Sequence, residues 1–487
     1  MSKKAFNDRT FALLTINYIV GFGFIATIVD IVKIGYWAIP ILFLTSFIAT
    51  ATAFAFSRLI SAFPNETGGS ISYAKKTNLK FLTCFTGFNQ YIKAPLFAAT
   101  GPLFLVNIAR VLTDNETTLW IVRAVSIAFY ICLVLLVTLQ VKVSKWFIFS
   151  TAIIKWICLI FGFIGLIVLV SKNSSNIVQN FNNVKNVNAY LIFSSIITFM
   201  FAFGGVETVP NIANSVKFNK FSKALIISIL LIIGLYTIGY ILFLNLDLNL
   251  ISGGFIDVYR RVLQTFGIVM FLTYLLFFNI SSTMTSTLTN PKVLVSASQI
   301  GFVPAFLSRT NRFNQHRNAI ITHVILIIIS MFIFTLLPLF VKSLNRNFFT
   351  SVINMGTIAF LFQYVLSFIT IFVLVIQKKM TNIRWYELLA YGLSVLFIIV
   401  PSFIYLFPFL VGQAWTVENT IVISTYAILF VIFLSYFFYA KSKNKINLNT
   451  KIEEEDDKEP TKADDKELIP KVNSLSDQQL NENKGTV

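Results

Sequence analysis

Glycine pairs interrupt two of the long apolar stretches of this chain. One pair is Gly21 and Gly23 in the first apolar stretch, and the other is Gly204 and Gly205 in the sixth. Glycine lowers the helix propensity of a segment, and hydrocarbon offers no partner for the backbone groups that an interrupted helix leaves free. Such breaks are tolerated where the backbone lines a cavity. The two pairs therefore predict a binding site built from the ends of half-helices.

A zwitterion such as an amino acid would find complementary partners at these ends. Its carboxylate suits the N–H groups at the positive start of a half-helix, and its ammonium suits the carbonyl groups at the end of one. Glycine also lets a ligand approach the backbone closely. The alternative is that the glycines only allow tight helix packing. The predicted substrate-binding residues are Ile19, Gly21, Phe22, Gly23, Phe201, Ala202, Gly204 and Gly205.

Ionisable residues inside apolar stretches are costly and are functional candidates by default. Glu207 follows the second glycine pair, where it would help couple a gate or sense protons, or would only bond the N–H groups freed at the break. Lys155 lies within the fifth stretch, too deep for easy snorkelling, although a snorkelling lysine is the alternative. Asn89, Gln90 and Lys93 in the third stretch fit either a cavity lining or a membrane interface.

The composition is that of a multi-pass membrane protein. Of the 487 residues, 56% are hydrophobic and 12% are charged, whereas roughly a quarter of a soluble domain is charged. We predict an all-α membrane protein with about twelve transmembrane helices of about 20 residues each. The predicted spans are 11–31, 36–57, 82–107, 119–140, 146–170, 190–213, 223–245, 262–288, 319–341, 350–376, 385–408 and 418–440.

The charges divide the chain into three regions. A net charge of +18 does not indicate a nucleic-acid partner, because the basic residues cluster in short loops between the spans. Their asymmetry predicts that both termini are cytoplasmic. Eleven of the 21 acidic residues follow Lys451, which is typical of a disordered tail. We expect a cytoplasmic stub at 1–10, a transporter domain at 11–440 and a charged, disordered cytoplasmic tail at 441–487. Two histidines are too few to predict a metal site with histidine ligands, and we expect no cofactor.

Four motifs together resemble the amino acid–polyamine–organocation transporter superfamily, and the resemblance covers residues 10–440. They are the first-span break GFG at 21–23, FPNETGGSISY at 63–73, FAFGGVE at 201–207 and KVLVSASQIGFVP at 292–304. Phe22 stands where the family has a small residue, which changes the shape of the pocket. The resemblance implies a five-plus-five inverted repeat (LeuT-like) in which helices 1 and 6 are discontinuous.

The resemblance also implies a role for Lys155. In several members of the superfamily, a lysine of the fifth span occupies the place that sodium takes in sodium-coupled relatives, and Lys155 looks like that residue. Its partners would be carbonyls near Gly21 and hydroxyls of the eighth span. A fixed ammonium would remove the need for sodium and could carry a proton. The predicted coupling and gating residues are Lys155, Glu207, Ser281 and Ser282.

These observations predict a secondary active transporter, an amino acid permease of the cell membrane that works by alternating access and not as an enzyme. It would be sodium-independent and would act as a proton symporter or an amino-acid antiporter. The alternatives are an exchanger of an amino acid for its decarboxylation product and a transporter-like nutrient sensor. Its partners would be a small-molecule amino acid and the lipid bilayer. The oligomeric state, monomer or homodimer, and the identity of the amino acid both stay open.

Overall fold

The computed structural model describes residues 16, 19–64, 66, 68–113, 115–139, 145–172, 176–184, 187–208, 221–311, 316–341 and 348–449. All regular elements among these residues are helices. The predicted stub at 1–10 and the part of the predicted tail beyond residue 449 lie outside the described residues.

Ten helical segments of the described chain are long and apolar enough to cross a membrane, and two shorter helices are also apolar. The prediction of an all-helical, multi-pass membrane protein is therefore confirmed. The long segments are α3 (Ala38–Ala62), α5 (Lys80–Phe97) with α6 (Thr100–Leu112), α7 (Glu116–Leu139), α8 (Lys145–Lys172), α11 (Phe221–Leu244), α12 (Phe255–Gln299), α13 (Arg317–Phe340), α14 (Phe348–Ile376), α15 (Trp385–Leu406) and α16 (Val417–Ser442).

The two shorter helices border the glycine pairs. Helix α2 (Phe22–Val32) begins directly after Gly21. Helix α10 (Ala189–Met200) continues as one 3-10 turn, η2 (Phe201–Phe203), and stops at Gly204. Gly205 then has a φ of +114°, which glycine adopts without the steric cost that a Cβ would bring. The backbone therefore leaves the helix where the glycines stand.

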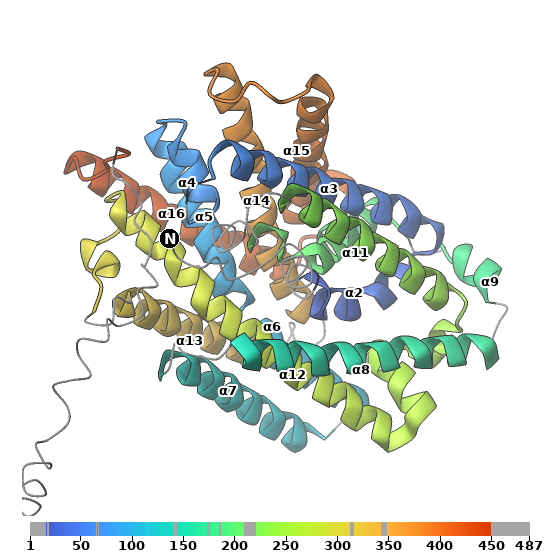
Figure 1. Ribbon diagram of the computed structural model, residues 1–487. Helices are drawn as coiled ribbons and strands as arrows, with labels where there is room; N and C mark the ends of the chain where they lie inside the picture. Colours follow the sequence, from blue (N-terminus) through green and yellow to red (C-terminus); the bar gives the residue numbers. More distant parts are fainter. Residues whose placement is uncertain are drawn as a thin grey trace, which may run out of the picture.

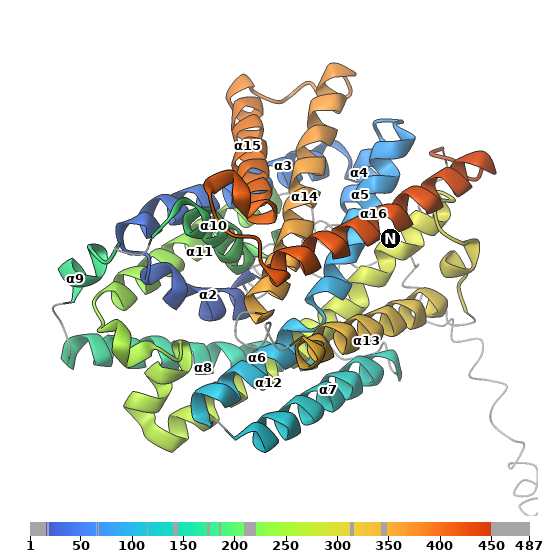
Figure 2. The same cartoon turned by 180° about the vertical axis from the view of Figure 1, so that it is seen from behind.

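Helix α2 lies between longer helices of the assembly. It contacts α10 and η2, as well as α11 and α12. In Figure 1, α3 and α11 lie on one side of α2, and α8 and α12 lie side by side on the other; Figure 2 shows the same arrangement from behind. Both glycine-bordered segments are thus enclosed by longer helices.

Helix α8 shows how the sequence orients a helix in this assembly. Its exposed large side chains follow a spacing of four and three residues, which places them on one helix face. They are Ile153, Ile157, Ile160, Phe161, Ile164 and Ile167. The other face buries Leu159, Leu166 and Lys155. An apolar stripe suited to lipid therefore turns the lysine toward the protein interior.

The chain after α16 folds back onto the loop that follows α12. The N–H of Asn447 donates a hydrogen bond to the carbonyl of Ile300 at 3.0 Å. Ile446 is buried in the same apolar cluster as Ile300 and Ile71. Gly301 has a φ of +76° and directly faces the backbone of the Lys445 region. The first residues of the predicted tail at 441–487 therefore pack against the transporter domain as far as they are described.

Candidate functional site

The two helix breaks lie directly against one another. A Cβ placed on Gly23 would lie 2.4 Å from the carbonyl oxygen of Phe201 and 2.7 Å from the Cα of Ala202. Both of these are backbone atoms, so no side-chain rotation can relieve the clash. Only glycine permits this approach of α2 to η2. Gly23 is therefore the residue that brings the two interrupted segments together.

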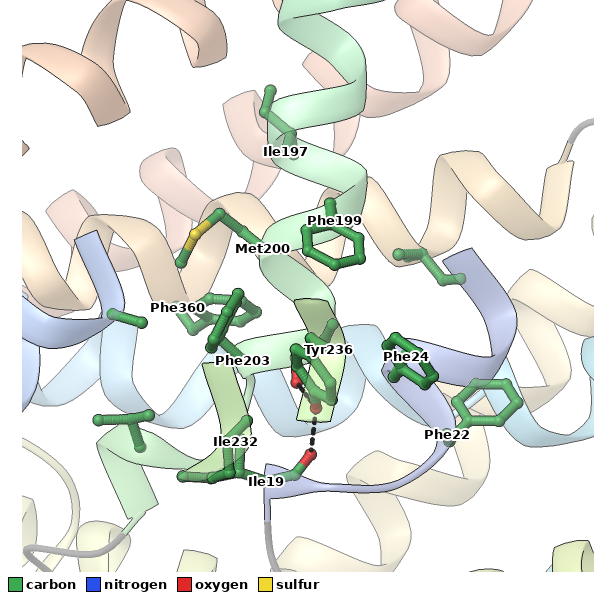
Figure 3. Close-up of a cluster of buried hydrophobic side chains, with 14 of the residues drawn as sticks. Ile19, Phe22, Phe24, Ile197, Phe199, Met200, Phe203, Ile232, Tyr236 and Phe360 are labelled. Carbon is green, nitrogen blue, oxygen red and sulfur yellow. Dashed lines mark hydrogen bonds between the residues drawn. The ribbon is translucent and has the colours of Figure 1, made fainter. Parts of the chain in front are cut away.

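Tyr236 of α11 joins both breaks through its hydroxyl group. The hydroxyl donates to the carbonyl of Ala202 at 2.7 Å and lies 3.4 Å from the carbonyl oxygen of Ile19. Its ring stacks on Phe24 of α2 with the centroids 4.6 Å apart, as Figure 3 shows. The Ala202 carbonyl therefore has a partner within the protein. The expectation that Ala202 contacts a substrate ammonium stays a prediction, because a carbonyl oxygen can accept a second hydrogen bond.

A cavity of about 260 Å³ lies beside this junction. Most of the predicted site residues line it, together with side chains of α5, α7, α12 and α13. The predicted residues in the lining are Ile19, Phe22, Gly23, Phe201, Gly204, Gly205, Glu207 and Ser282. The other four, Gly21, Ala202, Lys155 and Ser281, are not among the lining residues. Gly21 instead faces the ring of Phe278, where a Cβ would lie 2.5 Å from Cε2.

Lys155 lies at the first break, behind the cavity wall. Its side chain is 1% exposed, and its Nζ donates to the carbonyl of Val20 at 3.0 Å. The ammonium also lies 5.6 Å from the ring centroid of Phe278 of α12, within the range of a cation–π interaction. Ser281 is buried one helical turn beyond Phe278. Lys155 therefore links α8 to the break before α2 and to α12.

Glu207 forms a buried ion pair with Lys93 of α5, with Nζ 3.0 Å from Oε1. Its Oε2 accepts hydrogen bonds from the hydroxyl of Tyr364 and from the N–H of Gly205, each at 2.9 Å. Glu207 thus bonds a backbone group at the second break, and it also fixes α5 and α14 to that break. Sequence reasoning left Lys93 open. The pair could have been predicted, because charged residues within a membrane usually pair with one another and Glu207 is an acid in another apolar stretch.

Asn89 and Gln90 do not line the cavity. Both form hydrogen bonds that join neighbouring segments to α5. Asn89 donates to the carbonyl of Ala359 in α14 at 2.7 Å. Gln90 donates to the carbonyl of Gly68 and accepts from the N–H of Ile71, both at 3.1 Å. This fixes the motif at 63–73 on α5, although its residues 65 and 67 lie outside the described part of the chain.

Aromatic rings separate the cavity from a second one. The ring of Phe22 lies 4.4 Å from that of Phe104 and 6.0 Å from that of Phe349, and the latter two rings are 5.4 Å apart. Phe104 and Phe349 line a second cavity of about 700 Å³. Its charged lining residues are Asp30, Lys33, Arg110 and Glu116. Phe22, Phe104 and Phe349 form a partition that we call the aromatic partition.

A multi-pass helical assembly with a cavity at the meeting point of two interrupted helices has the architecture of a membrane transporter. The class is confirmed at the level of sequence family. Residues 6–447 match the family model described as amino acid permease, so this chain belongs to the amino acid permease family of the amino acid–polyamine–organocation superfamily.

Curated relatives of similar length are mycoplasma proteins. The chain is 28% identical over 477 residues to the uncharacterized protein MG225 of Mycoplasma genitalium, covering 92% of this chain and 97% of the relative. It is also 28% identical over 479 residues to the uncharacterized protein MG226 of the same organism, covering 91% and 96%. A homolog of MG226 in Mycoplasma pneumoniae is 24% identical over 494 residues, covering 93% and 98%.

Proposed function

We propose that this protein is a secondary active transporter that carries amino acids across the cell membrane by alternating access, without sodium. One observation supports the proposal above the others: the start of α2 and the end of η2 meet at a cavity of about 260 Å³. The first N–H groups of a helix attract a carboxylate, and the last carbonyls of another attract an ammonium. The two ends together match an α-amino acid.

We propose a five-plus-five inverted repeat for the helix assembly. The described chain has ten long apolar segments and two shorter ones, which makes twelve. The two shorter segments, Phe22–Val32 and Ala189–Phe203, are the first and the sixth in chain order. Two repeats of five helices, each opening with a discontinuous helix and followed by two further helices, would have this order.

Lys155 supports sodium independence. An ammonium that bonds the Val20 carbonyl at 3.0 Å supplies a positive charge at the first break without an added ion. Driving force would then come from a proton gradient or from a second amino acid carried in exchange.

The two cavities support alternating access. With both termini in the cytoplasm, α12 would run inward toward Asn290, so the cavity of about 260 Å³ would lie on the cytoplasmic side of the aromatic partition. The cavity of about 700 Å³ beside Lys33 and Arg110 would lie on the outer side. We propose that this conformation faces inward and that movement of Phe22, Phe104 and Phe349 opens the outer path.

Uptake of radiolabelled amino acids into proteoliposomes containing the purified protein tests the proposal. We expect saturable, stereoselective flux in sodium-free buffer. Counterflow by preloaded unlabelled amino acid would indicate exchange, and stimulation by an inward proton gradient would indicate symport. A folded, correctly reconstituted protein that moves none of the twenty amino acids would contradict the proposal.

The Glu207→Gln variant is expected to lose stability, because Lys93 would retain a buried charge without its carboxylate. Breaking a buried ion pair from one side costs about 3–5 kcal/mol. The double variant Lys93→Met with Glu207→Gln removes both charges and should recover much of the thermal stability in detergent. If Glu207 takes part in proton coupling, the pH profile of uptake by the double variant will flatten. An unchanged profile would leave Glu207 only the role of holding the break.

A further inference from the structure

Lys93 places a protein cation inside the proposed substrate cavity. It lies in α5, lines the cavity together with Glu207, and is 6% exposed. Its Nζ is 3.0 Å from Oε1 of Glu207. A carboxylate in a cavity would otherwise attract the ammonium or guanidinium of a ligand. Lys93 thus occupies the position that the charged end of a cationic amino acid would take.

The acceptor positions of Glu207 are largely used within the protein. Two oxygens offer about four lone-pair positions. Oε1 accepts from Lys93, and Oε2 accepts from Tyr364 and Gly205. These donors come from α5, from α14 and from the break itself, so about one acceptor position, on Oε1 beside Lys93, is left for a ligand.

The formal charges of the cavity lining cancel. Lys93 and Glu207 are its charged residues among those that the structure describes. His323 of α13 also lines the cavity, and its Nδ1 lies 3.3 Å from the hydroxyl of Tyr91. A lining with no net charge gives no advantage to a ligand that carries net charge, because that ligand would lose hydration without gaining a counter-charge.

One face of α12 adds polar groups to this cavity, whose other walls include the apolar side chains of Phe22, Phe97 and Met331. The lining residues of α12 repeat at intervals of three and four, so they project from a single helix face. The polar ones are Asn279, Ser282, Thr283, Ser286, Thr287, Thr289 and Asn290, and the apolar Phe278 of the same helix also lines the cavity. Hydroxyl and amide groups both donate and accept hydrogen bonds. This face suits a ligand side chain that carries hydroxyl or amide groups.

We propose that Lys93 determines substrate class, as a tethered cation that excludes cationic amino acids and leaves a cavity for amino acids with uncharged polar side chains. This inference rests on the proposed transport function and deepens it. The α-carboxylate and α-ammonium would bind at the two breaks, and the side chain would contact the polar face of α12.

The test is a substrate panel in proteoliposomes with wild type and the Lys93→Met variant. The panel contains serine, threonine, asparagine and glutamine, then lysine, arginine and ornithine, then glutamate and leucine. Wild type should prefer the uncharged polar group. Lys93→Met should gain uptake of the cationic group by at least about tenfold, because Glu207 then lacks its internal counter-charge. Lys93→Met with Glu207→Gln, whose lining is again neutral, should not gain it.

The outcomes separate this inference from the proposed function. Wild-type flux with a preference for cationic, acidic or apolar amino acids would overturn the inference and leave amino-acid transport standing. No flux of any panel member would contradict both. A folded Lys93→Met that gains no cationic substrate would overturn the role of Lys93. If that variant does not fold, the wild-type panel and Lys93→Arg, which should keep the wild-type preference, decide the matter.

Discussion

Replacing Gly23 by alanine is expected to abolish amino-acid uptake. The added Cβ would lie 2.4 Å from the Phe201 carbonyl oxygen and 2.7 Å from the Ala202 Cα, far inside van der Waals contact. Overpacking a well-packed interior typically costs about 1–3 kcal/mol and occasionally more. Relief requires α2 and η2 to separate, which would also lengthen the hydrogen bond between Tyr236 and Ala202. The measurement is initial uptake rate per folded, reconstituted transporter.

Gly234→Ala is the matched control for Gly23→Ala. Gly234 lies within α11, and a Cβ there would meet no atom within 4 Å. The same chemical change should therefore leave uptake close to wild type. If Gly23→Ala transports as well as Gly234→Ala does, the close contact of the two breaks is not required for transport, and the proposed site loses its main support.

Replacing Lys155 by alanine is expected to lower uptake by about fivefold to 150-fold. The buried Val20 carbonyl would lose the ammonium that donates to it at 3.0 Å. Leaving a buried acceptor unsatisfied costs about 1–3 kcal/mol. The loss falls at the break before α2, where the proposed carboxylate site begins. Uptake should be measured with and without sodium, and the wild-type rate should be equal in the two buffers.

Lys172→Ala is the matched control for Lys155→Ala, because Lys172 is an exposed lysine at the end of the same helix, α8. It should leave uptake unchanged. Wild-type uptake that depends on a sodium gradient would contradict the assignment of Lys155 as a fixed cation. So would a Lys155→Ala variant that keeps its full rate while Lys172→Ala behaves as expected.

Apart from the carbonyls near Gly21 expected for Lys155, the packing partners of the site lay beyond sequence reasoning. Lys93 and Glu207 are 114 residues apart, and Tyr236 and Ile19 are 217 apart. A tyrosine in an apolar helix is indistinguishable, by composition, from one that faces a membrane interface. Its role depends on which helix face meets α2, and that facing is set by the packing of α11 against α3.

The aromatic partition shows the same limit. Phenylalanine occurs 52 times in this chain, so its presence at positions 22, 104 and 349 predicts nothing about a partition. The three rings meet only because α2, α6 and α14 converge. Similarly, we predicted that the tail begins at 441 because the apolar residues end there. In the structure Ile446 is nevertheless buried, because the chain turns back and packs against Ile300.

The sequence alone determined the all-helical membrane class and the glycine positions at which α2 begins and η2 ends. Both follow from local physics, since a bilayer requires long apolar helices and glycine weakens a helix at its own position. The tertiary structure decided which groups meet at those places: Gly23 with the backbone of Phe201, Tyr236 with Ala202, and Lys93 with Glu207. These contacts join different helices, and their geometry depends on how whole helix faces pack.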